Sequence, residues 1–405
     1  MKCGISPQEY YGYLRGVNSF SFLQEPLWTN TGSGEKRFLI GLYKDDRIVG
    51  AATALIVKPI TGVRVLYIAR GPVFDLENEE LLQAFRDGIA GLARKNHAAF
   101  VKMDPCVINE KTAFRDISNY RNHFADTISA LKKAGFRHRG SGTDRLSGAW
   151  QPQLHKAIPL FDKNSGELLS ESAFLTALTK KMPKSRKYIF SDDYHEKRGV
   201  SFRRIKGPHN MDIFAGIMRA TEKRKNIFLR DKEYFQRMAE TFGDRAFFYY
   251  ASINTDKYIE FQKSRTGTDA DIRDAAKKAD MAAEKAGKYG KDIVIGASLV
   301  IMPYEHSGMR IAEYLFAGGN NLFPDVNCAR GLVYRGCIDA LRYGCRFFDL
   351  GGVPADPNEP LAVFKNTFYP DTFEFIGEFD LIINKVMYNI YARARSIRNR
   401  QRDGR

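Results

Sequence analysis

Two charged side chains stand where an apolar stretch ends, and their positions favour chemistry. Asp104 directly follows the strand-like run AAFVKM and precedes Pro105. Ligand sites in sheets covered by helices gather at the carboxyl ends of strands, so a functional carboxylate is plausible there; capping of the next turn is the alternative. Lys365 lies between aromatic residues in VFKNTF, after FFDLGGV and a proline-rich loop. We expect that loop to bring Lys365 back over the end of the preceding strand, where two glycines let the backbone approach a ligand.

A second pair suggests anion binding. Arg230 and Tyr234 are four residues apart in NIFLRDKEYFQRM, a spacing that would place both on one helix face. A planar guanidinium matches a phosphate, and a neighbouring tyrosine hydroxyl completes the grip. The pair therefore favours a phosphate site.

Several chemical classes lack a motif in this sequence. None of the seven histidines stands at metal-ligand spacing with another histidine or cysteine, so we expect no metal. The GxSxG, GxxxxGK[ST] and GxGxxG patterns of hydrolases, P-loop proteins and dinucleotide-binding proteins are missing. Five cysteines without a CxxC pair argue against a disulfide framework.

Basic residues outnumber acidic ones, 63 against 47, giving a net charge of +16. This excess attracts polyanions: nucleic acid, phosphorylated metabolites or anionic membrane. Ten Lys or Arg lie within residues 180–206 together with aromatic residues, a mixture that suits RNA because cations bind phosphates and rings stack on bases. A solvated face is the alternative. The arginine-rich tail, residues 393–405, is expected either to touch membrane or RNA or to act only in solubility.

The order of elements predicts two similar halves. Residues 37–68 read as a meander of antiparallel strands, followed by helix, strand, helix and strand up to about Phe161. A similar order begins again near Ala173. We therefore predict an α+β protein with these parts: residues 1–153 as a first domain, 154–252 with 293–380 as a second, 253–292 as an insertion, and 381–405 as a basic C-terminal helix or tail.

The insertion is rich in Ala, Lys and acids. Thr266, Gly267 and Thr268 mark a hairpin tip, and Asp269 is the expected N-cap of a helix reaching about Lys288. A short helical hairpin arm is therefore expected. Between Asp256 and Lys291 nine basic residues exceed seven acids by only two, so strong RNA binding by this arm alone is not expected.

Seven segments in this order resemble the Fem/MurM (FemABX) family of peptidoglycan-branching aminoacyl-tRNA-dependent aminoacyltransferases: YIARGPV, FVKMDP, NIFLRDKEYFQRM, YLFAGG, FFDLGGV, VFKNTF and FIGEFD. The likeness runs from about Gln24 to Asp380. It implies two tandem acetyltransferase-like (GNAT) domains, with the arm inserted in the second.

The resemblance also implies roles for single residues. Asp104 would lie near the acceptor peptide and Lys365 beside the aminoacyl ester of the tRNA, as the two catalytic positions. Arg230 and Tyr234 would grip the diphosphate of the muropeptide precursor. Among the basic residues of the RNA-like stretch, the candidates for tRNA contact are Lys180, Lys181, Lys184, Arg186 and Lys187.

The sequence departs from the family pattern at two places. Gly32 stands where many members have a phosphate-binding lysine after the tryptophan that matches Trp28, so Lys36 or Arg37 is expected to replace it. Phe316 stands where an aromatic hydroxyl is expected. Tyr314 lies two residues earlier, and we expect it on the opposite face of the strand.

The implied reaction moves an amino acid from aminoacyl-tRNA to the side-chain amine of the third stem-peptide residue in lipid II or UDP-MurNAc-pentapeptide. The ester is already activated, so no cofactor is expected. No apolar run reaches the ~20 residues of a membrane span, and the N-terminus does not resemble a signal peptide. A cytoplasmic monomer, with peripheral contact at the inner leaflet, is expected. An acyl-CoA-dependent N-acyltransferase and a non-catalytic RNA- or membrane-binding protein are the alternatives.

Overall fold

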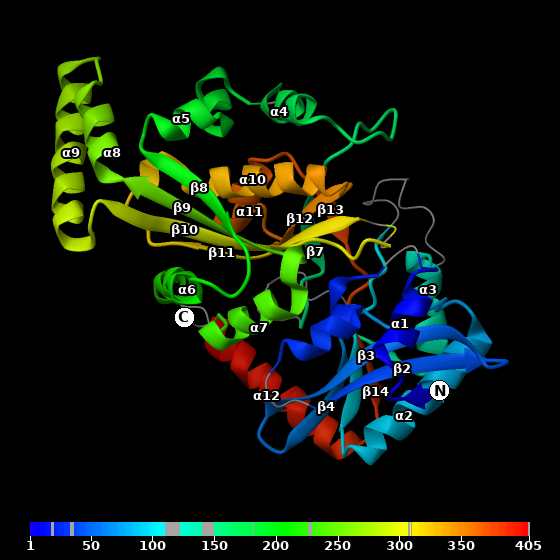
Figure 1. The fold of residues 1–405 in the computed structure, drawn as a ribbon. Helices are drawn as coiled ribbons and strands as arrows, with labels where there is room; N and C mark the ends of the chain where they lie inside the picture. The colour runs from blue at the N-terminus through cyan, green and yellow to red at the C-terminus, as the bar shows by residue number, and fades with distance from the viewer. Residues whose placement is uncertain are drawn as a thin grey trace. The chain divides into compact units, whose positions relative to one another are not determined.

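The chain forms two compact units in this computed structural model (Figure 1). Unit 1 comprises Met1–Pro159, Pro303–Arg310 and Asp349–Arg405, and unit 2 comprises Leu160–Met302 and Ile311–Phe348. The structure describes residues 1–17, 20–32, 36–109, 122–139, 150–180, 182–225, 229–306, 308 and 310–403. The predicted α+β class is confirmed, because each unit combines helices with β-sheet.

Unit 1 is built on a seven-stranded sheet in the order β1-β2-β3-β4-β5-β14-β6. Its neighbouring strands are antiparallel except for the parallel pair β4 and β5. The strands are β1 (Lys2–Cys3), β2 (Arg37–Lys44), β3 (Arg47–Ile60), β4 (Val63–Ile68), β5 (Phe100–Met103), β6 (Arg137–His138) and β14 (Phe379–Ile382).

Unit 1 contains further elements besides this sheet. Strand β7 (Leu154–Pro159) pairs in antiparallel fashion with β13 (Asp371–Glu374). The helices are α1 (Pro7–Leu14), η1 (Phe22–Gln24), η2 (Pro26–Asn30), α2 (Glu79–Lys95), α3 (Phe124–Lys133), α11 (Pro360–Asn366) and α12 (Lys385–Asp403). Strand β12 (Phe347–Gly352) begins in unit 2 and ends in unit 1.

The two faces of the sheet in unit 1 bury different helices. Along β4, Leu66 and Ile68 belong to the core that also contains apolar side chains of α2. Val63 and Val65 point the other way and pack in a cluster with Tyr388 and Tyr391 of α12. This alternation is the period-two pattern of a strand that is buried on both faces.

A buried ion cluster joins β14 to β5. Lys102 is fully buried, and its Nζ lies 2.8 Å from Glu378 Oε2 and 2.6 Å from Asp380 Oδ1. The strand pairing places Asp380 opposite Lys102. The sequence predicts that the second domain extends to residue 380. In the structure, Asp349–Arg405 belongs to unit 1 instead. Pairing of β14 with β5, a contact between residues far apart in the chain, accounts for that difference.

The described strands of unit 2, with the start of β12, lie in the order β12-β11-β10-β9-β8. Helix α10 lies on one face of this sheet, and α6 and α7 lie on the other (Figure 1). Besides β12, the strands are β8 (Val200–Ile205), β9 (Ala246–Asn254), β10 (Asp292–Ile301) and β11 (Ile311–Gly319). The helices are α4 (Glu171–Lys180), η4 (Lys184–Phe190), α5 (Asp192–Glu196), α6 (Met211–Lys225), α7 (Lys232–Phe242), η5 (Gly243–Arg245), α8 (Thr255–Lys263), α9 (Asp269–Tyr289), η6 (Pro324–Val326) and α10 (Cys328–Arg342).

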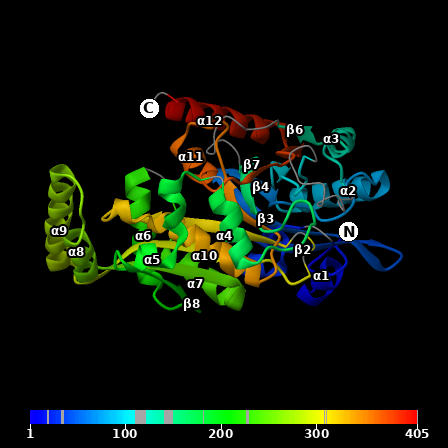
Figure 2. The same ribbon diagram turned by 90° about the horizontal axis from the view of Figure 1, so that it is seen from above.

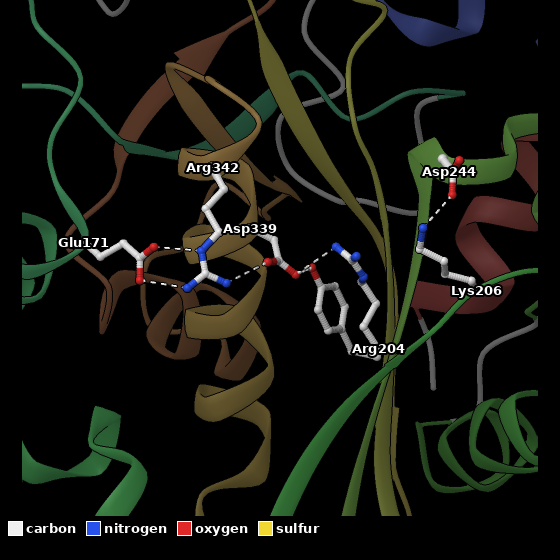
Figure 3. Close-up of polar contacts among 7 residues, drawn as sticks. Glu171, Arg204, Lys206, Asp244, Asp339 and Arg342 are labelled. Carbon is white, nitrogen blue, oxygen red and sulfur yellow. Dashed lines mark hydrogen bonds and ion pairs between the residues drawn. The ribbon is translucent and has the colours of Figure 1, made fainter.

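An ionic chain links α4, α10 and two strands of unit 2 (Figure 3). Glu171 accepts two hydrogen bonds from Arg342, at 2.7 and 3.0 Å. Asp339, one turn earlier on α10, accepts from Arg204 of β8 at 3.4 Å and from the Tyr249 hydroxyl of β9 at 2.8 Å. These contacts attach α10 to the edge of the sheet.

Two helices occupy the stretch that the sequence predicted to be inserted. Helices α8 and α9 follow β9 and lie side by side in both views (Figures 1 and 2). The predicted N-cap is wrong by one residue: Thr268, not Asp269, caps α9 and forms a capping box with Asp271. The box satisfies two free backbone N–H groups at once, which favours Thr268. Among the described residues, no helix is long and apolar enough to cross a membrane.

We predict that replacing Lys102 by Met lowers the free energy of unfolding by about 3–5 kcal/mol, because two buried carboxylates lose their counter-ion. Lys44→Met is the control, because the ion pair of Lys44 with Glu80 is exposed and water and salt screen such a pair, so its loss should change the stability little. Denaturant unfolding of both variants measures the two changes. Equal, small losses would contradict the structural role of Lys102.

Candidate functional site

The carboxyl ends of β4 and β5 bring Arg70 and Asp104 together. The parallel register pairs Ile68 with Met103, so the residues that follow the two strands are neighbours. The backbone N–H of Arg70 donates to Asp104 Oδ1 at 2.5 Å, and the Tyr67 hydroxyl donates to Asp104 Oδ2 at 2.7 Å. Asp104 is 1% exposed. The sequence placed this carboxylate at a strand end, and the structure adds the groups that hold it.

Burial changes the acidity of Asp104. Removal from water raises the pKa of its carboxyl to about 6, although the Arg70 charge and the two hydrogen bonds oppose this effect. Burial disfavours the ionised form of a carboxyl group, which explains the direction. Asp104 therefore changes protonation state close to neutral pH.

The guanidinium of Arg70 is enclosed as well. Its Nη2 donates to the Pro152 carbonyl at 2.7 Å and lies 3.1 Å from His155 Nε2. The guanidinium carbon lies 3.7 Å from the centre of the Phe375 ring, a cation–π distance. Arg70 is 4% exposed, so its charge acts on groups within unit 1.

The segment around Arg70 is fixed by Gln24, which is fully buried. Gln24 Nε2 donates to the Ala69 carbonyl at 2.6 Å, and its Oε1 accepts from the Thr53 N–H at 3.0 Å. A Cβ on Gly71 would lie 2.3 Å from the Gln24 side chain. Glycine is required there because the backbone passes so close to the amide.

His155 connects Arg70 to Asp349. Its Nδ1 lies 2.7 Å from Asp349 Oδ2, and Arg70 donates toward its Nε2. Burial lowers the pKa of His155, so the ring is neutral and carries its proton on Nδ1. Burial alone would raise the pKa of Asp349, but His155 and the Gly351 N–H at 2.7 Å outweigh it and lower that pKa. Gly351 has a φ of 80°, which glycine tolerates best.

Lys365 lies on α11 and is 7% exposed. Its Nζ donates to the Gly352 carbonyl at 2.8 Å, so the chain after β12 does return Lys365 to the end of that strand, as the sequence predicted. Burial lowers the pKa of Lys365 to about 8, while the charge of Asp349 opposes the change. Near that pH the protonated and the neutral form of the Lys365 amine are populated about equally, so the group can either donate or accept a proton.

Five buried ionisable residues thus form one group in unit 1, which we call the buried cluster: Arg70, Asp104, His155, Asp349 and Lys365. Asp104 and Lys365 both have pKa values displaced toward neutrality. Such displacements gather where protons are moved or charges are stabilised during a reaction, although structural ion pairs show them too. The cluster can therefore position a cationic group and exchange a proton.

The predicted anion site lies in unit 2. Arg230 precedes α7, which begins at Lys232 after the N-cap Asp231, so the expectation that Arg230 and Tyr234 share a helix face is wrong. The two residues nevertheless meet, because the Arg230 guanidinium carbon lies 5.1 Å from the centre of the Tyr234 ring. The Tyr234 ring also lies 5.9 Å from Phe316. The three predicted residues are therefore together.

Tyr314 belongs to a different environment. A bulge in the pairing of β11 with β10 separates Tyr314 from Phe316, so the two residues lose the regular alternation of a strand. The Tyr314 ring contacts Phe348, at 5.8 Å between ring centres, whereas Phe316 contacts Phe235 on α7 at 5.1 Å. The prediction of opposite faces agrees with these contacts, and the bulge is the reason.

Lys36 lines an open pocket of about 900 Å³ in unit 1. None of its lining residues is acidic: Lys36, Ile56, Val57, Lys58, Pro59, Arg64, Lys95, Asn96, His97 and Trp150. Lys36 precedes β2, Lys58 lies near the end of β3, Arg64 lies at the start of β4 and Lys95 ends α2. Arg37 instead donates to the Trp28 carbonyl at 3.1 Å and lies over the Trp28 ring.

The candidate tRNA contacts are only partly described. Lys181 lies outside the described residues, and the side chains of Lys184 and Arg186 do too. Lys180, at the end of α4, and Lys187, in η4, are exposed. These positions therefore stay a prediction.

Cations later in the same basic stretch have acidic partners. Lys206 lies 3.0 Å from Asp244 (Figure 3), and Lys197 lies 2.7 Å from Asp193. Arg204 is part of the ionic chain described above. Part of the charge that suggested RNA binding is therefore neutralised within unit 2.

Tertiary structure also brings together a group that sequence spacing did not indicate. Glu77, His123 and Asp126 have side-chain ligand atoms within 4.8 Å of one another. Glu77, however, already accepts from the His123 N–H and from the Thr127 hydroxyl at 3.1 Å. Tethering the start of α3 is a sufficient explanation for this group.

The residues that sequence reasoning missed in the buried cluster are Arg70 and His155. Arg70 stands within the quoted segment YIARGPV, and its position after a strand parallel to β5 was the available signal. His155 has no histidine or cysteine at metal-ligand spacing in the sequence, so its type alone indicates no role. Its partners, Arg70 and Asp349, are 85 and 194 positions away, so spacing offered no signal.

The fold and the cluster define an α+β protein with a sheet in each unit and a buried ionisable site in unit 1. The family model for the FemAB family matches residues 5–280 and 261–396, and the chain belongs to this family. It is 25% identical to the lipid II:glycine glycyltransferase of Staphylococcus aureus, over 96% of this chain and 94% of that protein. The crystal structure of FemX matches with a TM-score of 0.70 and 22% identity, over 96% of this chain and 99% of that one.

We predict that Asp104→Asn raises the free energy of unfolding near pH 8 by about 1–3 kcal/mol, and that the gain disappears below about pH 4. The folded-state pKa of about 6 exceeds the ordinary 3.8, so the folded protein is penalised once the carboxyl ionises. Asp349→Asn is the matched variant, and we expect it to lower the free energy of unfolding at neutral pH. The pKa of Asp349 is lowered in the folded protein, so its negative charge stabilises the fold there. Denaturant titrations at several pH values measure both; stabilisation by Asp349→Asn or destabilisation by Asp104→Asn near pH 8 would contradict the assignment.

Proposed function

We propose that this protein transfers an amino acid from aminoacyl-tRNA to the side-chain amine of the third stem-peptide residue of a peptidoglycan precursor. Family membership and the name of the Staphylococcus aureus relative support an aminoacyltransferase that builds interpeptide bridges. The observation that carries the proposal is the buried cluster. Hydrogen bonds run from Asp104 through Arg70 and His155 to Asp349, whose charge acts on Lys365.

In this reaction the acceptor amine attacks the ester carbonyl of the aminoacyl-tRNA. The new C–N bond forms, the ester C–O bond breaks, and a proton passes from the amine to the departing ribose oxygen. The ester is already activated, so the residues mainly orient two polyanionic substrates, an effect that can supply ~7–11 kcal/mol of the barrier.

Lys365 and Asp104 take different parts in the proposal. With a pKa near 8, the protonated Lys365 stabilises negative charge on the carbonyl oxygen or donates to the ribose oxygen. Asp104, with a pKa near 6, positions the acceptor ammonium, which gives up one proton to water before the neutral amine attacks the ester. It is a stronger base than an ordinary carboxylate, yet still far weaker than a lysine amine of pKa ~10.4. Positioning is therefore its main role.

The diphosphate of the precursor is assigned to Arg230 and Tyr234 of unit 2, and Lys36 of unit 1 is an independent candidate for that group. Arg230 is exposed and stands against the Tyr234 ring. The pocket that contains Lys36 offers cations without an acidic lining residue, which suits phosphates. Both lipid II and UDP-MurNAc-pentapeptide carry a diphosphate, so either acceptor fits this chemistry. We expect peripheral contact with the membrane if the acceptor is lipid-linked.

Transfer assays with purified protein test this function. tRNA charged with a radiolabelled amino acid is incubated with lipid II or with UDP-MurNAc-pentapeptide, and parallel reactions receive acyl-CoA donors or ribonuclease. We expect ribonuclease-sensitive transfer to the muropeptide. Transfer only from acyl-CoA would establish the alternative N-acyltransferase, and transfer from neither donor to any muropeptide would refute the proposal.

We predict that Lys365→Met lowers kcat by more than about a hundredfold, with the acceptor Kd nearly unchanged. In the wild type, kcat should fall as pH rises through about 8, because Lys365 loses its proton there. Lys365→Arg, whose guanidinium stays charged, should lack this alkaline fall even if its rate is lower. Lys156→Met is the control, since Lys156 is half-buried on β7 and hydrogen-bonded to Thr372. A wild-type rate for Lys365→Met would exclude the assigned role.

A further inference from the structure

Helix α12, drawn in red in Figure 1, carries three exposed apolar side chains. Val386, Ile390 and Ile397 are 70%, 48% and 58% exposed. Their spacings of four and seven residues place them along one side of the helix. Arg393, also exposed, stands between Ile390 and Ile397 on the same side. We call these four residues the α12 stripe.

The opposite side of α12 fixes the direction in which the stripe points. The rings of Tyr388 and Tyr391 are each 5.0 Å from Phe100 of β5. The Tyr388 hydroxyl donates to Asp380 at 2.8 Å, and Arg395 lies 3.7 Å from Glu378. The helix is therefore anchored on the strand that leads to Asp104, and its exposed apolar row is a stable feature of unit 1.

The composition of α12 selects among possible partners. Besides Arg395, which lies against Glu378, five Lys or Arg and one acid lie between Lys385 and Asp403, and the whole chain has a net charge of +16. A second copy would bring the same positive charge against itself. RNA would bind the cations but would leave the three apolar side chains in water. An anionic lipid surface satisfies both, because the headgroups bind the cations and the acyl boundary takes up the apolar side chains.

We propose that the α12 stripe is the membrane-docking surface of this protein and that its partner is a bilayer containing anionic phospholipid. Docking by the stripe would place unit 1 at the surface that holds a lipid-linked acceptor. The biological purpose of this contact rests on the proposed function. Vesicle binding is measured without tRNA or muropeptide, so its result is independent of whether transfer occurs.

The experiment is flotation of the full-length protein with vesicles of phosphatidylcholine alone or of phosphatidylcholine with phosphatidylglycerol. We expect binding to the anionic vesicles only, weakening as salt is added. The triple variant Val386→Ser, Ile390→Ser and Ile397→Ser should bind more than about tenfold less tightly. Arg393→Gln should bind less tightly by about fivefold, because each basic residue near an anionic surface contributes ~1 kcal/mol.

Matched changes on another helix serve as the control. Ile272 and Met281 of α9 are 50% and 43% exposed, and Ile272→Ser with Met281→Ser should bind vesicles like the wild type. Thermal unfolding of every variant checks the fold, and transfer to the soluble acceptor checks the active site. The proposal is overturned if the wild type does not float with anionic vesicles, if the triple variant floats equally well, or if the α9 variant loses as much binding. It is also overturned if light scattering shows a dimer that the triple variant dissociates.

Discussion

Everything in the candidate site depends on how unit 1 accommodates the carboxylate of Asp104 away from water. A buried carboxylate is tolerated only with hydrogen bonds and a counter-charge. The Arg70 N–H and the Tyr67 hydroxyl supply the hydrogen bonds, and the guanidinium of Arg70 supplies the charge. Because Arg70 follows β4 and Asp104 follows β5, the parallel pairing of these strands is what makes the arrangement possible.

The same requirement extends from one residue to the next. Arg70 is itself buried and directs its guanidinium to His155, which is oriented by Asp349. Asp349 in turn opposes the effect of burial on Lys365. Burial of this group raises the pKa of Asp104 and lowers the pKa of Lys365. Both pKa values therefore lie nearer to neutral pH than those of the free side chains. The environment that makes the cluster costly for folding is therefore the one that suits it to proton movement.

Unit 1 uses a second buried ion cluster for a different purpose. Lys102 lies on β5, two residues before Asp104, and its amine forms ion pairs with Glu378 and Asp380. Both belong to the segment that forms β14 and leads into α12. Strand β5 thus carries the candidate catalytic acid at its end and anchors the C-terminal helix through Phe100 and Lys102. A contact made by α12 would act on the strand that supports the site.

The sequence by itself determined the α+β class, most strands and helices, the family, and the positions of Asp104 and Lys365 at strand ends, because these features are local: apolar periodicity, strand ends and short ordered motifs. The expected helix face for Arg230 and Tyr234 was wrong, because α7 begins only at Lys232. It did not determine the partners of Asp104. His155 gave no local signal, since its contacts join residues 85 and 194 positions apart. Strand β14, the bulge that separates Tyr314 from Phe316 and the exposed row of α12 likewise follow from pairing and burial. Tertiary structure alone decides which charges lose water, and hence which pKa values move.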